Sequence, residues 1–444
     1  MGIDLLDADT LVPAIVAAAR DRSALSDELH FAARGPAERY HLDRGRANPL
    51  RALDILPDAA VLQLGAEYGA LTRHLGETAR LVDAVEPDPD RAAVVTLRTA
   101  GLAGVRVVGG LAGLPDGVGY DLAVIAEPGV RPALLRAVLG RLRPEGVLVI
   151  CAADLVGRRE AESALRSAGL PVARVLTCTP GHPVARAVVS EDLAREQPRL
   201  AVALAPAEEP GFLVLGGPRA DLLWPAERLA RYFNTTDRSA AWCTSADVVR
   251  TATGAEVRRT PLRPDPEPVA GIRVRPCVDV VRDAPTMLTV LLEEPWRVAE
   301  LLSGWRDLLR AQAPQVGPAL WDLLPHNVLV DGAALHPIDL EWEHATAGVA
   351  EVTERGLLVL AHYLTVHGWV GAADDSPMRE LAGWLGVLLG LDPSFVDAAA
   401  AREVDFGTIG SCGTDRGAEE VRGAIRMVWE QRLEQKAGEY RSPS

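Results

Sequence analysis

The chain has 444 residues, of which 48% are hydrophobic, and its formal net charge is −15. This length exceeds what one ordinary hydrophobic core supports and predicts two or three domains. The negative charge excludes non-specific binding to a nucleic-acid backbone, which needs a basic surface, so no nucleic-acid partner is expected. Lys436 is the only lysine, which excludes any mechanism that requires a lysine elsewhere in the chain.

Nothing in the apolar pattern predicts a membrane span. The longest apolar stretch, residues 381–391, is shorter than a helix that crosses a bilayer. Residues 1–20 indicate a capped amphipathic helix and not a signal peptide. The five cysteines are scattered and have no CxxC spacing, so we expect reduced thiols in a cytoplasmic protein.

Residues 58–150 alternate short apolar runs with amphipathic helical patterns, which predicts a parallel sheet covered on both faces. In such a sheet the ligand lies at the carboxyl ends of the strands. The stretch "VLQLGAEYGALTRHL" fits the first crossover, with Gly65 and Gly69 allowing a tight turn between strand and helix. Glu86 closes the next strand, where a carboxylate can accept hydrogen bonds from both hydroxyls of a ribose.

With the later element "LRPEGVLVI", the region of roughly residues 45–200 resembles the class I S-adenosylmethionine-dependent methyltransferases. The resemblance implies that Gly65, Gly69 and Glu86 contact S-adenosylmethionine. The open alternatives are a dinucleotide cofactor, for which the GxGxxG pattern is missing, and a Rossmann-like scaffold that binds no cofactor.

The sequence departs from the family pattern at two positions of the first turn. Gln63 stands where the family has an acidic residue, and Glu67 stands where it has its middle glycine. A glutamate adds bulk where the backbone would approach the ligand, and its charge could face the methionine carboxylate. We therefore count Glu67 among the cofactor-binding positions and expect it to weaken binding.

Two catalytic candidates lie in this half. Residues 38–53 precede the first strand and place His41 beside Tyr40 and several arginines, where it could orient a hydroxyl or bind an anionic sugar group. A solvated helix start is the plain alternative. Glu127 follows the fourth apolar run, and it is the candidate general base that removes the proton of an acceptor hydroxyl.

The pattern changes after residues 211–217, which we expect to supply a final strand to the first domain. Residues 242–262 predict a β-hairpin with a glycine in its turn. A proline-rich break and helical material at 296–311 follow.

Three polar residues of the second half have the spacing of a phosphotransferase site. Asp322 and Asn327 are five positions apart, as in the D-x-x-x-x-N catalytic loop, and Asp339 returns after a short strand in the place of the D-F-G aspartate. Roughly residues 235–400 resemble the protein-kinase-like and aminoglycoside-phosphotransferase-like enzymes. The resemblance implies that Asp322 orients the attacking hydroxyl while Asn327 and Asp339 hold Mg²⁺ of Mg-ATP. The alternative is that the aspartates only cap turns.

The lysine that these enzymes use against the nucleotide phosphates is absent. Arg258 or Arg259 stands in its place, and Arg259 is our candidate for the nucleotide contact. Arginine presents a broad planar fork, so the exchange is not conservative at a fitted site, and no glycine-rich loop precedes the hairpin. We expect a kinase-like fold with impaired phosphotransfer.

Together the two halves predict an α/β Rossmann-like methyltransferase domain followed by an α+β kinase-like domain. This order resembles bacterial enzymes that terminate polysaccharide chains by phosphorylation and methylation. We expect a methyltransferase acting on a sugar hydroxyl or related small biosynthetic acceptor, either a small molecule or a glycan. The alternative is a non-catalytic two-domain scaffold that regulates a partner enzyme. The predicted segments are an N-terminal helical part, the methyltransferase domain, the kinase-like domain and a C-terminal helical tail: 1–45, 46–220, 221–400 and 401–444.

The C-terminal tail carries Val421, Ile425 and Val428 at helical spacing. This apolar stripe suits either a homo-oligomer contact or simple packing on the core.

Overall fold

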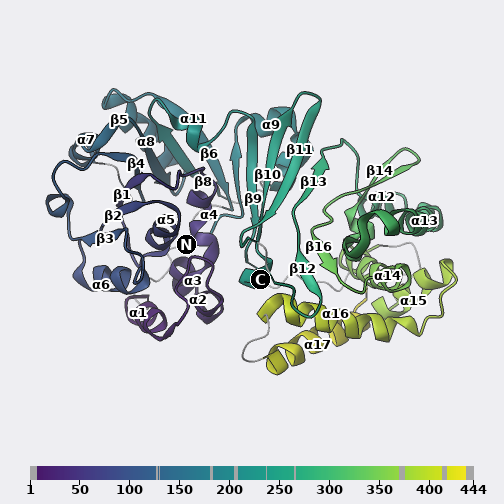
Figure 1. Cartoon of the computed structure of the whole chain (residues 1–444). Helices are drawn as coiled ribbons and strands as arrows, with labels where there is room; N and C mark the ends of the chain where they lie inside the picture. The colour runs from purple at the N-terminus through teal and green to yellow at the C-terminus, as the bar shows by residue number, and fades with distance from the viewer. Residues whose placement is uncertain are drawn as a thin grey trace. The chain divides into compact units, whose positions relative to one another are not determined.

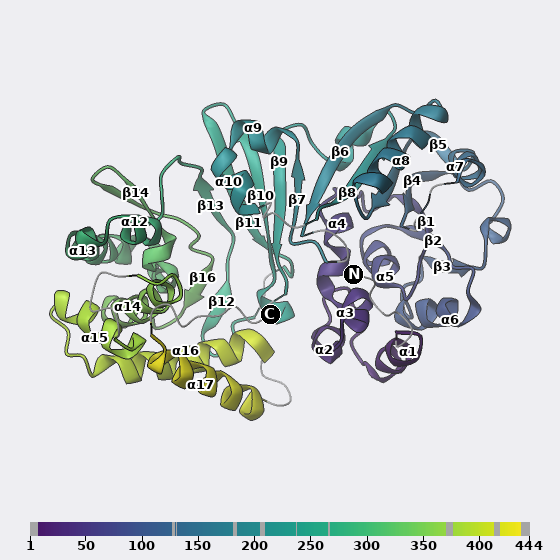
Figure 2. The same cartoon turned by 180° about the vertical axis from the view of Figure 1, so that it is seen from behind.

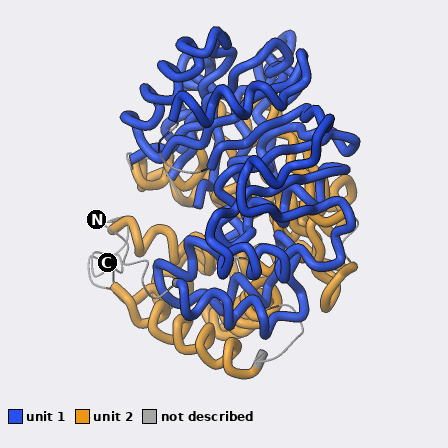
Figure 3. The backbone as a smooth tube through the Cα atoms, turned by 90° about the vertical axis from the view of Figure 1, so that its left-hand side faces the viewer, with its two compact units in different colours: residues 1–236, 245–255 blue, residues 237–244, 256–444 orange. Residues whose placement is uncertain are grey.

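The computed structural model consists of two compact units, coloured separately in Figure 3. Unit 1 is Met1–Thr236 with Ser245–Ala255, and unit 2 is Asp237–Thr244 with Glu256–Ser444. The structure describes residues 8–436 apart from these internal positions: 127–128, 130, 181–183, 205–208, 237, 265–266, 370–375 and 413–417.

Unit 1 is built on a twisted sheet with the strand order β10-β9-β7-β6-β8-β5-β4-β1-β2-β3 (Figures 1 and 2). Strands β1 to β5 pair in parallel, whereas β8 lies antiparallel between β5 and β6. Strands β6, β7 and β9 continue the sheet with antiparallel pairs. The strands are β1 (Ala60–Leu64), β2 (Leu81–Val85), β3 (Val105–Val108), β4 (Tyr120–Ile125), β5 (Leu142–Ala152), β6 (Val172–Thr179), β7 (Ala187–Ser190), β8 (Gly211–Gly216), β9 (Arg228–Asn234) and β10 (Thr244–Thr251).

Helices cover both faces of the parallel part of this sheet. Leu62 and Leu64 of β1 pack in one buried cluster with Leu135 of α7 and Leu165 of α8, while α5 and α6 follow β1 and β2 and contact each other. The helices of unit 1 are α1 (Ala8–Ala18), α2 (Asp27–Ala32), α3 (Pro36–Leu42), the 3-10 helix η2 (Arg44–Ala47), α4 (Asn48–Arg51), α5 (Ala70–Thr78), α6 (Pro89–Arg98), η3 (Leu111–Gly113), α7 (Pro132–Leu139), α8 (Leu155–Ser167), α9 (Asp192–Glu196), α10 (Pro198–Leu204) and α11 (Ala220–Leu223).

The parallel sheet predicted from residues 58–150 is confirmed. Every residue of β1 is buried, as expected for a strand covered on both faces, and its one polar side chain is that of Gln63. The strand order reverses between β1 and β4, so the crevice at the carboxyl ends of these strands is the switch point where open α/β sheets bind ligands. The final strand expected at residues 211–217 is β8 (Gly211–Gly216), but this strand lies inside the sheet, and β9 and β10 follow it in unit 1.

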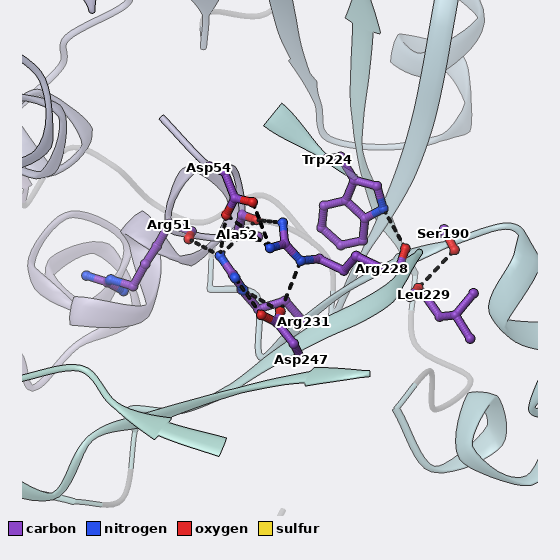
Figure 4. A network of polar contacts seen from close by, with 9 residues as sticks. All are labelled: Arg51, Ala52, Asp54, Ser190, Trp224, Arg228, Leu229, Arg231 and Asp247. Carbon is purple, nitrogen blue, oxygen red and sulfur yellow. Dashed lines mark hydrogen bonds and ion pairs between the residues drawn. The ribbon is translucent and has the colours of Figure 1, made fainter. Parts of the chain in front are cut away.

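A network of two arginines and two aspartates ties the segment before β1 to β9 and β10 (Figure 4). Arg228 donates to both oxygens of Asp54 at 3.1 and 2.8 Å, and its Nε lies 3.1 Å from Asp247. Arg231 donates to both oxygens of Asp247 at 2.6 Å and to Asp54 at 3.2 Å. The indole of Trp224 stacks under Arg228, with 5.3 Å between guanidinium carbon and ring centroid. Each arginine is therefore shared by both carboxylates.

Unit 2 combines small antiparallel strand pairs with a helical core. Strand β11 pairs with β13, β12 with β16, and β14 with β15. Its elements are η4 (Ala240–Trp242), β11 (Gly254–Pro261), β12 (Ile272–Val274), β13 (Cys277–Val280), α12 (Met287–Glu293), η5 (Pro295–Arg297), α13 (Val298–Val316), η6 (Gly317–Asp322), η7 (Pro325–Asn327), β14 (Val328–Asp331), β15 (Ala334–Pro337), β16 (Trp342–His344), α14 (Val349–Val366), α15 (Met378–Leu388), α16 (Phe395–Cys412) and α17 (Ala418–Glu434).

The last helix, α17, packs on the core of unit 2 through one side. Trp429 and Leu433 are buried in that core, and Ile425 packs against it. Val428, in contrast, is 43% exposed. Of the three residues in the predicted apolar stripe, Ile425 therefore serves core packing and Val428 faces away, while an oligomer contact through this helix stays a prediction.

Within the described part of the chain, no helix combines the length and apolarity needed to cross a membrane.

The Figure 4 network predicts a measurable loss of stability when one carboxylate is removed. Asp247→Ala leaves Arg228 and Arg231 sharing Asp54 alone, and we expect the free energy of unfolding to fall by about 1.5–3 kcal/mol, the range for hydrogen bonds to charged groups. Urea denaturation of unit 1 followed by circular dichroism measures the change. The control is Glu145→Ala, which breaks the exposed pair with Arg219 and should cost less than about 1 kcal/mol. Equal losses in both variants would contradict a structural role for the network.

Candidate functional site

The turn between β1 and α5 runs from residue 65 to residue 69 and has left-handed backbone at three positions. Gly65 and Gly69 have φ angles of 78° and 80°, and Glu67 between them has φ of 51° although it is not glycine. A Cβ at Gly69 would lie 3.3 Å from the Cα of Val95, so α6 packs directly on this turn. The turn therefore needs glycine at its ends and holds Glu67 in a conformation that costs energy.

Glu86 follows β2 and faces this turn. The residue is buried, with 6% of its surface exposed. Its Oε2 accepts the backbone N–H of Glu67 at 2.7 Å, and its Oε1 accepts the N–H of Asp88 at 3.1 Å. A carboxylate has about four acceptor positions, so each oxygen can accept one further hydrogen bond. The structure thus brings Gly65, Glu67, Gly69 and Glu86 together.

The Glu67 carboxylate is held by the segment that precedes β1. Oε1 accepts the hydroxyl of Tyr40 at 3.1 Å, and Oε2 accepts Nη2 of Arg46 at 3.1 Å. The Nδ1 of His41 lies 3.8 Å from the same Oε2. Arg46 also lies over the ring of Tyr40, with 4.6 Å from guanidinium carbon to centroid. One acidic side chain therefore joins the turn to α3 and η2.

His41 is enclosed by two tyrosine rings. Its ring centroid is 4.5 Å from that of Tyr40 and 4.6 Å from that of Tyr68. Burial and the nearby charge of Arg46 lower the pKa of His41 to about 3, so the imidazole is neutral at pH 7. Burial also raises the pKa of the Tyr40 hydroxyl. The other catalytic candidate, Glu127, lies outside the described residues.

Gln63 and a small cavity complete this region. Gln63 is fully buried; its Nε2 donates to the Gly65 carbonyl at 3.4 Å, and its Oε1 has no hydrogen-bond partner among the described residues. A cavity of about 30 Å³ lies beside Arg46 and is lined also by Leu71, Cys151 and Phe212. That volume suffices for about one water molecule.

In unit 2 the loop from Asp322 to Asn327 is fixed by hydrogen bonds within the predicted constellation. Asp322 is buried, and its Oδ2 accepts the N–H groups of Glu341 at 3.1 Å and Trp342 at 3.2 Å. The Nδ2 of Asn327 donates to the carbonyl of Asp322 at 2.9 Å. The N–H of Ile338, which precedes Asp339, donates to the carbonyl of Asn327 at 2.9 Å. Asp322, Asn327 and Asp339 thus lie in one cluster.

Arg259 lies in this cluster and Arg258 does not. The Nε of Arg259 is 2.6 Å from Oδ1 of Asp339, and its Nη1 donates to Asp279. Arg259 is opposite Cys277 in the pairing of β11 with β13, so Asp279 is its diagonal neighbour on the same face of the pair. Arg258 points to the other face, where it pairs with Glu256. Arg259 is therefore the buried one of the two arginines, and its contact with a nucleotide stays a prediction.

The carboxyl groups of this cluster are perturbed by their shared burial. Desolvation, followed by the charges of Asp339 and Glu341, raises the pKa of Asp322 to about 8. Burial also raises the pKa of Asp339, against the opposing charge of Arg259. Asp339 has φ of 60°, and its N–H donates to Asp279 at 3.1 Å.

The residues predicted to hold a metal are close to each other, but the carboxylate of Asp339 is already paired with Arg259. Over the described residues, no group of three or more His, Cys, Asp or Glu side chains is arranged to hold a metal ion. The sequence did not identify Asp279 as the second partner of Arg259, nor Arg46 as the partner of Glu67. The alternation in "CVDV" was the available signal for Asp279, because it places Cys277 and Asp279 on one face.

No family model and no curated protein matches the chain. One solved structure that resembles it is the precorrin-8w decarboxylase from Methanobacterium thermoautotrophicum, with 19% identity and a TM-score of 0.29, covering 39% of this chain and 89% of that one. Another is the precorrin-6y C5,15-methyltransferase from Geobacter metallireducens, with 20% identity and a TM-score of 0.28, covering 38% of this chain and 86% of that one. The N-methyltransferase NodS from Bradyrhizobium japonicum in complex with S-adenosyl-L-homocysteine is another (17%, 0.29, 44% and 94%). Such identities and TM-scores do not by themselves carry a functional argument. The Rossmann-like fold of unit 1 rests on its own strand order.

The raised pKa of Asp322 predicts how stability depends on pH. Since the folded-state pKa of about 8 exceeds the ordinary value of 3.8, the folded protein binds more protons than the unfolded chain between these values. Stability contributed by this group is therefore greatest below pH 4 and is lost as the pH rises toward 8. Asp322→Asn has no carboxyl group at this position and should not lose stability in this way. The free energy of unfolding of the variant, minus that of wild type, should therefore increase with pH by at most about 1.4 kcal/mol per pH unit.

Urea denaturation of both proteins from pH 5 to pH 9 measures this difference. A difference that stays constant across the range would contradict a protonated Asp322. Asp307→Asn is the control, because Asp307 lies in an exposed pair with Arg310 and should show no such dependence.

Proposed function

We propose that unit 1 binds S-adenosylmethionine and transfers its methyl group to the hydroxyl of a sugar or related small biosynthetic acceptor. The observation that carries the proposal is the carboxylate of Glu86, held against the Gly65–Gly69 turn by the 2.7 Å hydrogen bond from Glu67. This arrangement lies at the switch point between β1 and β4, where an open α/β sheet binds a nucleoside.

The remaining strands disfavour a dinucleotide cofactor. A dinucleotide-binding sheet repeats its parallel βαβαβ half on the other side of the switch point. Here β8 runs antiparallel beside β5, and β6, β7 and β9 also form antiparallel pairs. One nucleoside site is what this topology supports.

The residues at the site fit S-adenosylmethionine at its ribose end. Glu86 is buried and has acceptor positions left for two hydroxyls. At the amino-acid end, the negative charge of Glu67 at the turn disfavours binding of the ligand's carboxylate. When bound, S-adenosylmethionine would supply an activated methyl group, and the task of the protein is to orient the acceptor and to remove its proton.

Among the catalytic candidates, the properties of His41 support a positioning role. With a pKa near 3 the imidazole holds a proton poorly at pH 7, which makes it a weak general base. Glu127 remains the proposed base for the acceptor hydroxyl, because it follows the last residue of β4 by two positions in the sequence.

The first test removes the ribose contact. Glu86→Ala deletes an acceptor that would make two hydrogen bonds of about 1.5–3 kcal/mol each to the ligand, so we expect affinity for S-adenosylhomocysteine to fall at least tenfold. Isothermal titration calorimetry measures the affinity, with circular dichroism to verify folding. The control is Asp90→Ala, an exposed carboxylate in the first turn of α6. Unchanged affinity in Glu86→Ala would refute the assignment of this residue.

For unit 2 we propose a kinase-like domain with impaired phosphotransfer. The support is the joint placement of Asp322, Asn327 and Asp339, with an amide and a carboxylate near a buried carboxyl that could orient a hydroxyl. The impairment follows from Arg259, whose guanidinium pairs with both Asp279 and Asp339. A cation that is part of the chain lies where Mg²⁺ would need free carboxylate oxygens.

The same observation favours the rival function, a non-catalytic scaffold. Glu67 in unit 1 and Asp339 in unit 2 are each paired with an arginine of the chain. A protein that only binds and regulates a partner enzyme would tolerate both pairs. The two functions differ in whether unit 1 binds S-adenosylmethionine.

The second test exchanges the internal cation for a metal. We expect wild type to show no saturable Mn²⁺ binding in titrations followed by electron paramagnetic resonance, and to consume ATP at the background rate with glycan acceptors present. Arg259→Ala frees two carboxylates and should gain Mn²⁺ binding, whereas Arg258→Ala removes the same charge from the exposed face and should not. Rapid ATP consumption by wild type that Asp339→Ala abolishes would overturn the impaired-kinase proposal.

A further inference from the structure

Arg46 is a buried cation that depends on a nearby carboxylate. The residue is 3% exposed, and the carboxylate in contact with it is that of Glu67, 3.1 Å from Nη2. Arg46 also contacts Tyr40, through its ring and its hydroxyl at 3.3 Å. Leaving a buried guanidinium without a counter-charge is strongly unfavourable. Removal of Glu67 from Arg46 therefore leaves a buried charge that another anion can compensate.

The two members of this pair differ in their access to solvent. The side chain of Glu67 is 27% exposed, whereas that of Arg46 is 4% exposed. Glu67 is therefore the more accessible member of the pair. A ligand that reaches the turn can contact its carboxylate, whereas the guanidinium is almost wholly covered.

Glu67 is also directly linked to the proposed ribose contact. Its backbone N–H donates to Glu86, and its side chain binds Arg46, so one residue spans both contacts. A ligand with its ribose on Glu86 lies next to the backbone of Glu67, whose side chain pairs with Arg46. If that ligand also carries a carboxylate, Glu67 repels it and Arg46 attracts it.

The backbone of Glu67 shows that this placement is imposed by its surroundings. Its φ of 51° is unfavourable for a residue with a side chain. Such a conformation persists where surrounding contacts over-determine it, and here Tyr40, Arg46 and Glu86 each bind the residue.

We propose that Glu67 is an internal competitor for Arg46: its carboxylate occupies the guanidinium that a ligand carboxylate would otherwise bind. The pair then determines how strongly unit 1 prefers nucleosides with an amino-acid tail over nucleosides without a carboxylate. This inference rests on the proposed binding of S-adenosylmethionine and adds Arg46 and Glu67 as its specificity-determining residues.

The experiment compares two ligands that differ in the tail. S-adenosylhomocysteine and 5′-methylthioadenosine share the adenosine and the thioether, but only the first has a carboxylate. Calorimetric affinities of both are measured for the full chain as wild type, Glu67→Gln and Arg46→Gln. The control is Glu77→Gln, whose carboxylate is 29% exposed and paired with Arg73 at 2.6 Å, so its charge and exposure match those of Glu67.

We expect Glu67→Gln to bind S-adenosylhomocysteine about tenfold more tightly, because repulsion is removed and Arg46 is released, while affinity for 5′-methylthioadenosine changes less than about twofold. Arg46→Gln should weaken S-adenosylhomocysteine at least about tenfold and leave 5′-methylthioadenosine nearly unchanged. Glu77→Gln should behave as wild type with both ligands. If Arg46→Gln does not fold, the two affinities of Glu67→Gln still decide the question.

Three results would overturn the proposal, and they are distinguishable. An equal gain for both ligands in Glu67→Gln would mean that the glutamate obstructs the nucleoside and not the carboxylate. Weaker binding of S-adenosylhomocysteine in Glu67→Gln would mean that Glu67 contacts the ligand favourably. Failure of both ligands to bind any folded variant would remove the proposed function itself.

Discussion

Ion pairs between buried arginines and carboxylates recur in the interior of both units and hold segments of chain together. The sole lysine lies near the C-terminal end of the chain, so the internal cations are arginines. Arg46 pairs with Glu67 at the turn after β1, Arg228 with the aspartates of the Figure 4 network, Arg259 with Asp339, and Arg355 with Glu403 at 2.6 Å. An arginine fork can hold two oxygens in fixed directions, which lets one residue fix two segments of chain. The pairs at the candidate sites are members of this larger set.

The two candidate sites share a left-handed backbone conformation at the acidic residue that pairs with the arginine. Glu67 and Asp339 are acidic residues with left-handed backbone, at φ of 51° and 60°. In each case the N–H of the residue donates to a second carboxylate, that of Glu86 or Asp279, while its side chain binds an arginine. The strained residue is therefore held by its backbone N–H and by its side chain. A ligand at either site has to compete with an ion pair that also stabilises the local backbone.

The sequence predicted the parallel sheet, its glycine turn and the neighbourhood of Glu86, because these depend on local patterns. Apolar runs, turn glycines and the interval to the next strand can all be recognised within a few tens of residues of sequence. The partners of Glu67 and Arg259 were not predicted, since they depend on which distant segments the fold brings together. Tyr40 and several arginines stand before the first strand, but nothing in the sequence couples Tyr40 or Arg46 to Glu67. The interior place of β8 was missed for the same reason, because an apolar run does not specify its neighbours or its direction.

The position of β8 has a consequence for the order in which unit 1 can assemble. Strand β6 precedes β8 in the chain, yet it reaches β5 only through β8. During synthesis β1 to β5 can associate first, and β6 can pair with β7 as a hairpin, but the two parts have no shared strand until β8 is made. Their joining is thus a late, non-local step that closes a long loop, the kind of step that slows folding. Until then, one edge of β5 and one edge of β6 present unpaired backbone groups, and the nascent chain is exposed to mispairing at both.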